Sequence, residues 1–253
     1  MAIAYETRRI VMVELDKPTC SAKCELGSAS QWIATHLALE PTQYQVLTNI
    51  EALKYLCFDD IAGVVICGLW HSESYWEYRS TMVNWLVWLY QQSVPIFAFG
   101  EGHLYLAEAL GGRVSDGIIS YQIGKHVLQT VNSDSEQWIN DNELHHASTV
   151  QTTFSTALHF VKNKPDCARS LLQDTILPNY FLKYHDLCYS IQPQVGITWS
   201  AMVMWLAEHP AYWHVNTQVL EHRQSEQWGI GVLKGFVHFC LGIQSQHDVM
   251  VVH

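Results

Sequence analysis

Short apolar runs recur along the first half of the chain, separated by longer segments of mixed polarity. Arg9–Glu14, Tyr44–Leu47 and Pro95–Phe99 have the length and the β-branched or aromatic content of strands. Ile61–Cys67 is apolar throughout, which is typical of a strand that is buried on both faces of a parallel sheet. The pattern therefore predicts four strands in this half.

The segments between these runs have the spacing of amphipathic helices. Ser28–Leu39, Ser74–Gln92 and His103–Leu110 are predicted to be helical, and Gly111 and Gly112 end the last of them. Apolar residues recur at helical spacing: Trp32, Ile33 and Leu37 in the first segment, and Met82, Trp85, Leu86 and Leu89 in the second. Strands that alternate with helices favour a parallel sheet with crossover helices.

The second half has a different pattern. Ile118–Val131, Thr152–Val161 and Phe181–Gln192 alternate apolar with polar residues and are predicted to be strands of an antiparallel layer or mixed edge. Two helices are expected to follow, Thr198–Glu208 with Thr198 as N-cap, and Gln224–Leu241. No linker or repeat interrupts the pattern, so residues 1–253 are expected to form a single α/β domain with a mostly parallel central sheet flanked by helices.

Composition excludes several kinds of partner. The chain has 253 residues, 49% of them hydrophobic, and a formal net charge of −10. An acidic protein has no electrostatic basis for binding nucleic acid or anionic membrane surfaces. No window approaches the roughly 18 uncharged apolar residues of a spanning helix, and the N-terminus lacks the pattern of a signal peptide. Seven cysteines at scattered spacings favour reduced thiols and a cytoplasmic location.

The fourteen histidines raise the question of a metal site. The closest group is the pair His145 and His146, but neighbours on a strand point to opposite faces. HExxH and paired CxxC motifs are absent from the sequence. We therefore expect no metal and no other cofactor.

Two of the predicted strand ends are candidates for a ligand site, because ligands of such folds lie at the carboxyl ends of parallel strands. One is Cys67 with Gly68. The other is the bend from Gly100 to His103, where small residues suit a sharp strand-to-helix turn.

The segment around this bend resembles the nucleophile elbow of class I glutamine amidotransferases. Pro95–Val114 reads PIFAFGEGHLYLAEALGGRV, against the family's G-x-C-x-G-H-Q turn, and Gly102 and His103 are in register. Ala98 stands at the family's first glycine. Three further segments are similar to family motifs in the same order: Asp60–Ser72, Tyr121–Val127 and Ser190–Thr198. The resemblance implies a flavodoxin-like fold.

The resemblance also shows what the chain lacks. It places Gly100 at the nucleophile, Gln194 at the catalytic histidine and Gly196 at the glutamate. The family's reaction needs a thiolate to attack the glutamine carboxamide, an imidazole to move the proton and a carboxylate to orient that imidazole. Because these residues supply none of the three, glutamine hydrolysis by the usual route is predicted to be absent.

The resemblance further implies which residues surround the old pocket. They are Gly68, Leu69, Trp70 and His71 on the loop that helps to form the oxyanion hole, with Gly102 and Leu104 at the elbow. Leu104 replaces the family's glutamine and removes a polar group. The aromatic residues Trp70, Tyr75, Trp76 and Tyr78 either line the mouth of the pocket or belong to the core or a partner contact.

Other residues could replace the missing triad. Glu101 and His103 could form an acid–base pair, but we favour a solvated turn residue at Glu101 and a His103 that packs behind the elbow. Cys67 could be reactive with His71 as its base, yet a free cysteine is more often a small buried hydrophobe.

Three functional hypotheses follow. In the first, the protein acts by binding a small molecule or a partner, without glutaminase activity. In the second, it is an enzyme that uses Glu101, His103 or Cys67. In the third, the register is wrong and a conventional glutaminase site is present. Active members of the family supply ammonia to a synthase or ligase, so an acceptor here would be a separate polypeptide.

Overall fold

The structure of the protein is a computed structural model that describes residues 8–14, 27–67, 73–115, 123–130, 149–154, 159–173, 178–193, 195, 204, 207 and 227–242. The strands are β1 (Arg9–Glu14), β2 (Tyr44–Leu47), β3 (Ile61–Cys67), β4 (Ile96–Phe99), β5 (Arg113–Val114), β6 (Ile123–Thr130), β7 (Thr149–Phe154), β8 (Val161–Asn163), β9 (Arg169–Gln173), β10 (Phe181–His185) and β11 (Cys188–Ile191). The helices are α2 (Ala29–His36), α3 (Glu73–Gln91), α4 (Glu101–Ala109) and α7 (Gln227–Leu241), with 3₁₀ helices η2 (Ile50–Tyr55) and η3 (Phe58–Asp60).

Nine of the described strands form one sheet in the order β2-β1-β3-β4-β11-β10-β9-β6-β7, and β5 and β8 form a separate pair. The first five strands of this order are parallel to one another. The others pair antiparallel. The order β2-β1-β3-β4, with β11 in fifth place, is that of flavodoxin-like doubly wound sheets. The predicted α/β fold with a parallel centre is confirmed.

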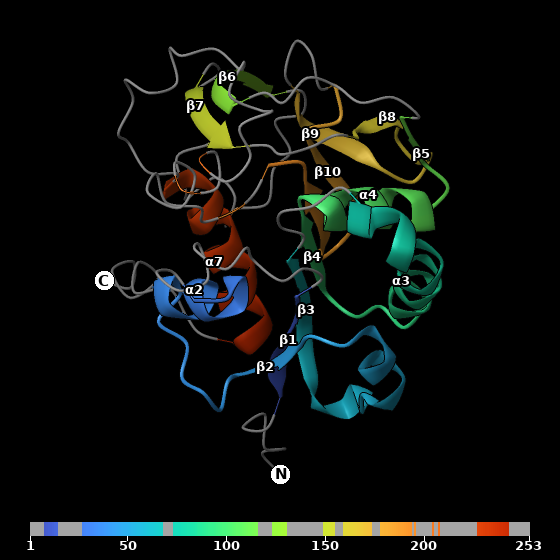
Figure 1. Ribbon diagram of the computed structural model, residues 1–253, viewed down its shortest axis with the longest axis vertical. Coiled ribbons are helices and arrows are strands. Elements are labelled where there is room, and N and C mark those ends of the chain that lie inside the picture. Colours follow the sequence, from blue (N-terminus) through green and yellow to red (C-terminus); the bar gives the residue numbers. More distant parts are fainter. Residues whose placement is uncertain are drawn as a thin grey trace, which may run out of the picture.

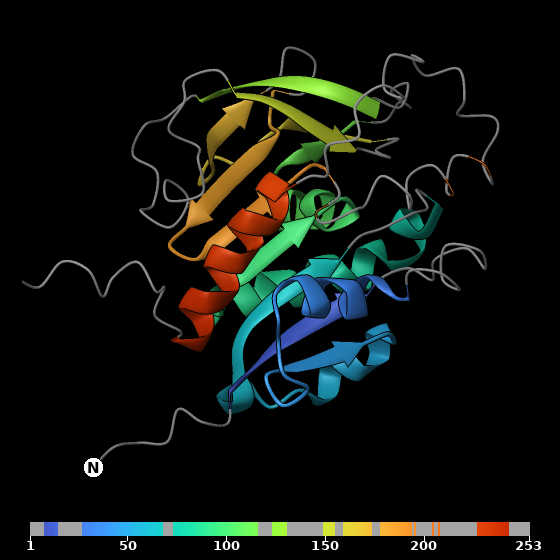
Figure 2. The same ribbon diagram turned by 90° about the vertical axis from the view of Figure 1, so that its left-hand side faces the viewer.

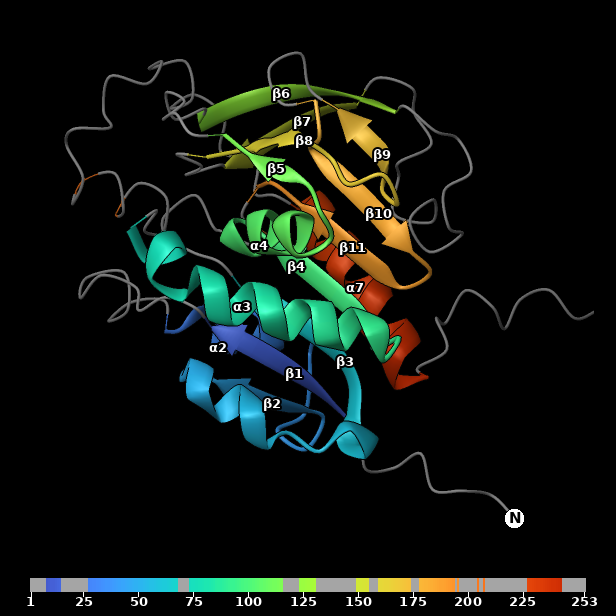
Figure 3. The same ribbon diagram turned by 90° about the vertical axis from the view of Figure 1, so that its right-hand side faces the viewer.

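Helices cover both faces of the parallel strands (Figure 1). α2 and α7 lie on one face and are in front in Figure 2, whereas α3 and α4 lie on the other and are in front in Figure 3. Each face has its own core, and β3 contributes to both: Val65 and Cys67 pack toward α2 and α7, and Val64 and Ile66 toward α3 and α4. Because both faces are buried, the sequence of β3 is apolar at every position.

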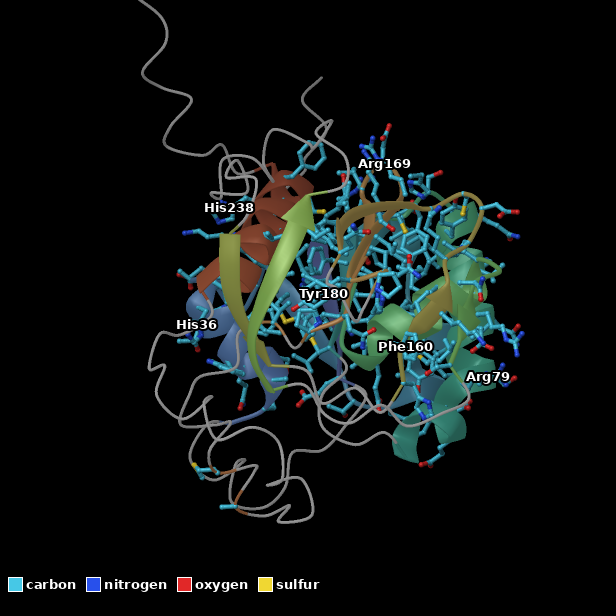
Figure 4. All side chains as sticks on the ribbon, turned by 90° about the horizontal axis from the view of Figure 1, so that it is seen from above. His36, Arg79, Phe160, Arg169, Tyr180 and His238 are labelled. Atoms are coloured by element: carbon cyan, nitrogen blue, oxygen red, sulfur yellow. The ribbon has the colours of Figure 1, made fainter. Side chains whose placement is uncertain are left out.

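The predicted helices of the first half are confirmed. Ser28 is the N-cap of α2, and its side chain and that of Gln31 form a capping box. The apolar residues that were expected to share one side of α3 are all buried: Met82, Trp85, Leu86 and Leu89. Arg79 of α3 donates to Glu108 of α4 through Nε, at 2.9 and 2.7 Å from the two carboxylate oxygens, and lies at the rim of the molecule in Figure 4.

Two strand predictions for the second half are wrong in detail. The interval Phe181–Gln192 is a hairpin, in which β10 and β11 are joined through a turn where Leu187 has a φ of 62°. Because this turn contains neither glycine nor proline, the sequence carries no turn signal there. Thr152–Val161 was predicted to be one strand, but its two ends belong to different strands: β7 ends at Phe154 and β8 begins at Val161.

The second half was also expected to contain two helices. The later one is confirmed as α7, which begins at Gln227 and ends at the predicted Leu241. The earlier one, Thr198–Glu208, lies outside the described residues except for positions 204 and 207. None of the helices in the described part of the chain combines the length and apolar character that a membrane crossing requires.

Candidate functional site

The bend between β4 and α4 has the backbone geometry of a nucleophile elbow. Gly100 is the N-cap of α4, with φ 58° and ψ −124°. A positive φ of this kind favours glycine, and a residue with a side chain would be strained there. Sharp strand-to-helix turns of this type expose a nucleophile at their tip in other enzymes. In this chain the tip carries no side chain.

Gly102 fixes the distance between α4 and β3. A Cβ atom at this position would lie 2.9 Å from Cγ2 and 3.0 Å from the carbonyl oxygen of Ile66. Both distances are shorter than a normal contact, so only glycine allows the first turn of α4 to approach the end of β3 this closely. The elbow is therefore held against the carboxyl end of the neighbouring strand.

The strand on the other side of the elbow is β11. Its Ile191 pairs with Phe99, and the amide of Gly100 donates to the Ile191 carbonyl at 3.2 Å. Gln192 is buried, and its amide donates to the carbonyl of Tyr180, which lies at the centre of the view from above in Figure 4. The chain therefore ends β11 beside the elbow, and Gln194 and Gly196 follow two and four positions after Gln192. These two residues lie outside the described part of the chain.

His103 is fully buried beneath the elbow. Its Nδ1 lies 2.6 Å from Oγ of Ser190, which lies 2.7 Å from the hydroxyl of Tyr184. Burial lowers the pKa of His103 to about 3, although the backbones of Asn179 and Ser190 oppose this shift. The imidazole is therefore neutral at neutral pH and links α4 to β10 and β11. This is the position expected of a histidine that packs behind the elbow.

Sequence reasoning missed Ser190 and Tyr184 as members of this network. In the motif that Ser190–Thr198 resembles, the family has glycine at the position of Ser190. This serine in place of glycine was the one sign in the sequence that a polar side chain could reach His103. Tyr184 is fully enclosed, and burial raises the pKa of its hydroxyl well above the ordinary value. Both hydroxyls are therefore neutral hydrogen-bonding groups, and they join the first turn of α4 to the strands beneath it.

Glu101 differs from the expectation. Its exposed fraction is 9%, so the prediction of a solvated turn residue is wrong. The reason is tertiary, because the first turn of α4 is enclosed: Glu101, Gly102, His103 and Leu104 are all buried. Leu104, which was predicted to border the pocket, packs in the core between α3 and α4.

Cys67 lies away from the elbow helix. It ends β3 and packs in the core under α2 and α7, whereas Ile66 faces α4. Burial raises the pKa of the Cys67 thiol, and the nearby Glu14 carboxylate raises it further. Glu14 accepts from the amide of Ala29 at 3.2 Å and from the hydroxyl of Ser30 at 2.7 Å. The structure thus keeps Cys67 as a buried thiol and separates it from His103.

The remaining predicted pocket residues lie outside the described part of the chain. They are Gly68, Leu69, Trp70 and His71. The histidine pair at 145 and 146 and the side chains of Tyr75 and Trp76 also lie outside it. Tyr78, the remaining member of the aromatic group, is half-buried and packs against the core under α3 and α4.

Comparisons with known proteins give relatives in structure only. No protein-family model and no curated protein matches the sequence. A glutamine amidotransferase of Thermotoga maritima is similar with a TM-score of 0.67 and 14% identity, over 93% of this chain and 98% of that one. A glutamine amidotransferase of Methylobacillus flagellatus is similar with a TM-score of 0.60 and 14% identity, over 95% and 98%.

A third neighbour is a protein of Thermoplasma acidophilum that is named as a GMP synthase subunit. Its TM-score is 0.63 at 12% identity, over 93% of this chain and 95% of that one. At these identities the likeness concerns the fold, and it extends over nearly the full length of each of the three neighbours. The resemblance inferred from the elbow is confirmed at that level: the chain has the class I glutamine amidotransferase fold.

Proposed function

We propose that this protein is a glutamine amidotransferase-like protein that does not hydrolyse glutamine and acts by binding a small molecule or a partner polypeptide. The observation that carries the proposal is Gly100 at the tip of the elbow, since glycine has no group that can attack a carbonyl. The buried, neutral His103 and the buried thiol of Cys67 support it, because neither is placed to replace the nucleophile.

The site that remains would bind without covalent chemistry. The proposed register adds Gln194 and Gly196, which supply neither a base nor a carboxylate to orient one. The Thermoplasma acidophilum neighbour is named as one subunit of GMP synthase, which favours a separate synthase or ligase polypeptide as the partner of this chain too. We further propose one domain over residues 1–253 and a cytoplasmic location, on the strength of the uninterrupted pattern and the scattered cysteines.

Ammonia release from glutamine tests the proposal. We expect the purified protein to give no more ammonia than buffer. Gly100→Cys alone should also be inactive, because no base would activate the new thiol, although it should be labelled by iodoacetamide. The combined variant Gly100→Cys, Gln194→His and Gly196→Glu is expected to recover measurable hydrolysis.

Two results would contradict the proposal. Ammonia release by the natural protein that Glu101→Gln or Cys67→Ser abolishes would favour a non-standard catalytic site. Release that survives both substitutions but is lost with another single change would mean that the register is wrong. A circular dichroism spectrum of each variant controls for folding.

A further inference from the structure

Aromatic and acidic residues lie at the end of the sheet opposite the elbow, on the face that α3 and α4 cover. Tyr55 at the end of η2 is 86% exposed and Trp88 of α3 is 37% exposed. The ring of Phe58 contacts that of Trp88 edge-on, with the centroids 3.9 Å apart. Asp59 and Asp60, which follow Phe58 in η3, are both exposed. We call these five residues the aromatic–acidic surface.

The topology places η3 and Trp88 at the amino ends of the parallel strands, and Tyr55 lies three positions before Phe58 in the chain. η3 leads directly into β3, and the last turns of α3, which contain Trp88, lead into β4. Gly100, in contrast, follows the carboxyl end of β4. In Figure 3 the turns between β2 and β3 lie below α3, and α4 lies above it. A partner bound to the aromatic–acidic surface would leave the elbow open.

The aromatic and acidic side chains of this surface favour a positively charged ligand. A single exposed aromatic residue needs no explanation, but here Phe58, whose ring contacts Trp88, is followed directly in the chain by two exposed aspartates. Aromatic faces attract arginine and lysine through cation–π interactions, and the carboxylates of Asp59 and Asp60 add charge complementarity. The contact with Phe58 holds the ring of Trp88 in place, which reduces the entropy lost on binding. Lys54 is the single basic residue between positions 40 and 60, so the local charge is negative.

We propose that the aromatic–acidic surface binds an arginine-bearing segment of a protein partner. This proposal is independent of whether the elbow hydrolyses glutamine, because the surface and the elbow lie at opposite ends of the strands. The proposal also differs from a general attraction of cations to an acidic protein, because it assigns the binding to particular aromatic rings and carboxylates.

The test uses the full chain and a short fluorescein-labelled peptide of alternating arginine and glycine, followed by fluorescence anisotropy. We expect saturable binding that weakens with added salt. Asp59→Asn with Asp60→Asn, and separately Tyr55→Ser, should each weaken binding by about fivefold to tenfold. The matched control is Glu40→Gln with Glu77→Gln, which removes the same charge from exposed positions elsewhere. It should change affinity less than about twofold.

Three outcomes would overturn the proposal: no saturable binding by the natural protein, equal weakening by the two double variants, or equal competition by a peptide of alternating leucine and glycine. The last would assign the surface to an apolar partner instead. All the substituted residues are exposed, so unchanged thermal unfolding is expected and shows that the variants fold. Glutamine hydrolysis is measured separately, so failure here leaves the function proposed for the elbow unaffected.

Discussion

Replacing Gly102 by alanine is expected to lower the free energy of unfolding by about 2 kcal/mol, because the new methyl group would overpack the joint between α4 and β3. The added Cβ would meet the Ile66 carbonyl at 3.0 Å, and that carbonyl belongs to a central strand with β1 and β4 on either side. The Ile66 side chain alone could shift, but the backbone of β3 cannot move without disturbing both neighbours. Equilibrium unfolding in urea gives the measurement.

Gly229→Ala is the matched control for this prediction. Its Cβ would meet Val195 at 3.5 Å, an ordinary contact, and the residue lies inside α7. Alanine is favoured over glycine within helices, so this variant is expected to gain up to about 1 kcal/mol. If the two variants unfold at the same urea concentration, the close approach of α4 to β3 does not limit stability.

The protein is expected to lose stability in mild acid, by about 2 kcal/mol between pH 7 and pH 5, because of His103 alone. The pKa of His103 is about 3 in the folded chain, against 6.5 as its ordinary value. Between these values the unfolded state binds a proton that the folded state does not. The contribution is therefore complete above pH 6.5 and is lost progressively as the pH falls toward 3.

The comparison that isolates His103 is the variant His103→Gln, which keeps a hydrogen-bonding group near Ser190 but has no group that titrates in this range. Unfolding free energies measured from pH 7 to pH 5 should fall less steeply in the variant than in the natural protein. His36→Gln removes an exposed imidazole and serves as the control, which should follow the natural protein. Parallel curves for His103→Gln and the natural protein would show that the buried imidazole does not set the acid sensitivity.

The sequence predicted the parallel half of the fold closely because each strand there is a separate apolar run. β1, β2 and β3 begin and end at the predicted residues. The helix predicted from Ser28 also begins where expected, with Ser28 as the N-cap of α2. The position of the elbow could also be predicted from local sequence. A tight bend needs residues without a bulky side chain, and glycines mark the bend here.

The surroundings of the elbow could not be predicted, because they depend on contacts between distant residues. His103 and Ser190 are 87 positions apart in the chain, and no local sequence pattern predicts their hydrogen bond. The burial of Glu101 arises in the same way, from elements packed around the first turn of α4. The hairpin of β10 and β11 was missed because its turn, at Asp186 and Leu187, contains neither glycine nor proline.

The place of β11 in the sheet has a consequence for synthesis of the chain. β4 is flanked by β3, which precedes it, and by β11, which is made much later. Until residues 188–191 leave the ribosome, one edge of β4 has unpaired backbone groups and apolar side chains, the kind of surface that promotes aggregation. We therefore expect a nascent chain that contains β4 but not yet β11 to depend on chaperones that cover unpaired strand edges.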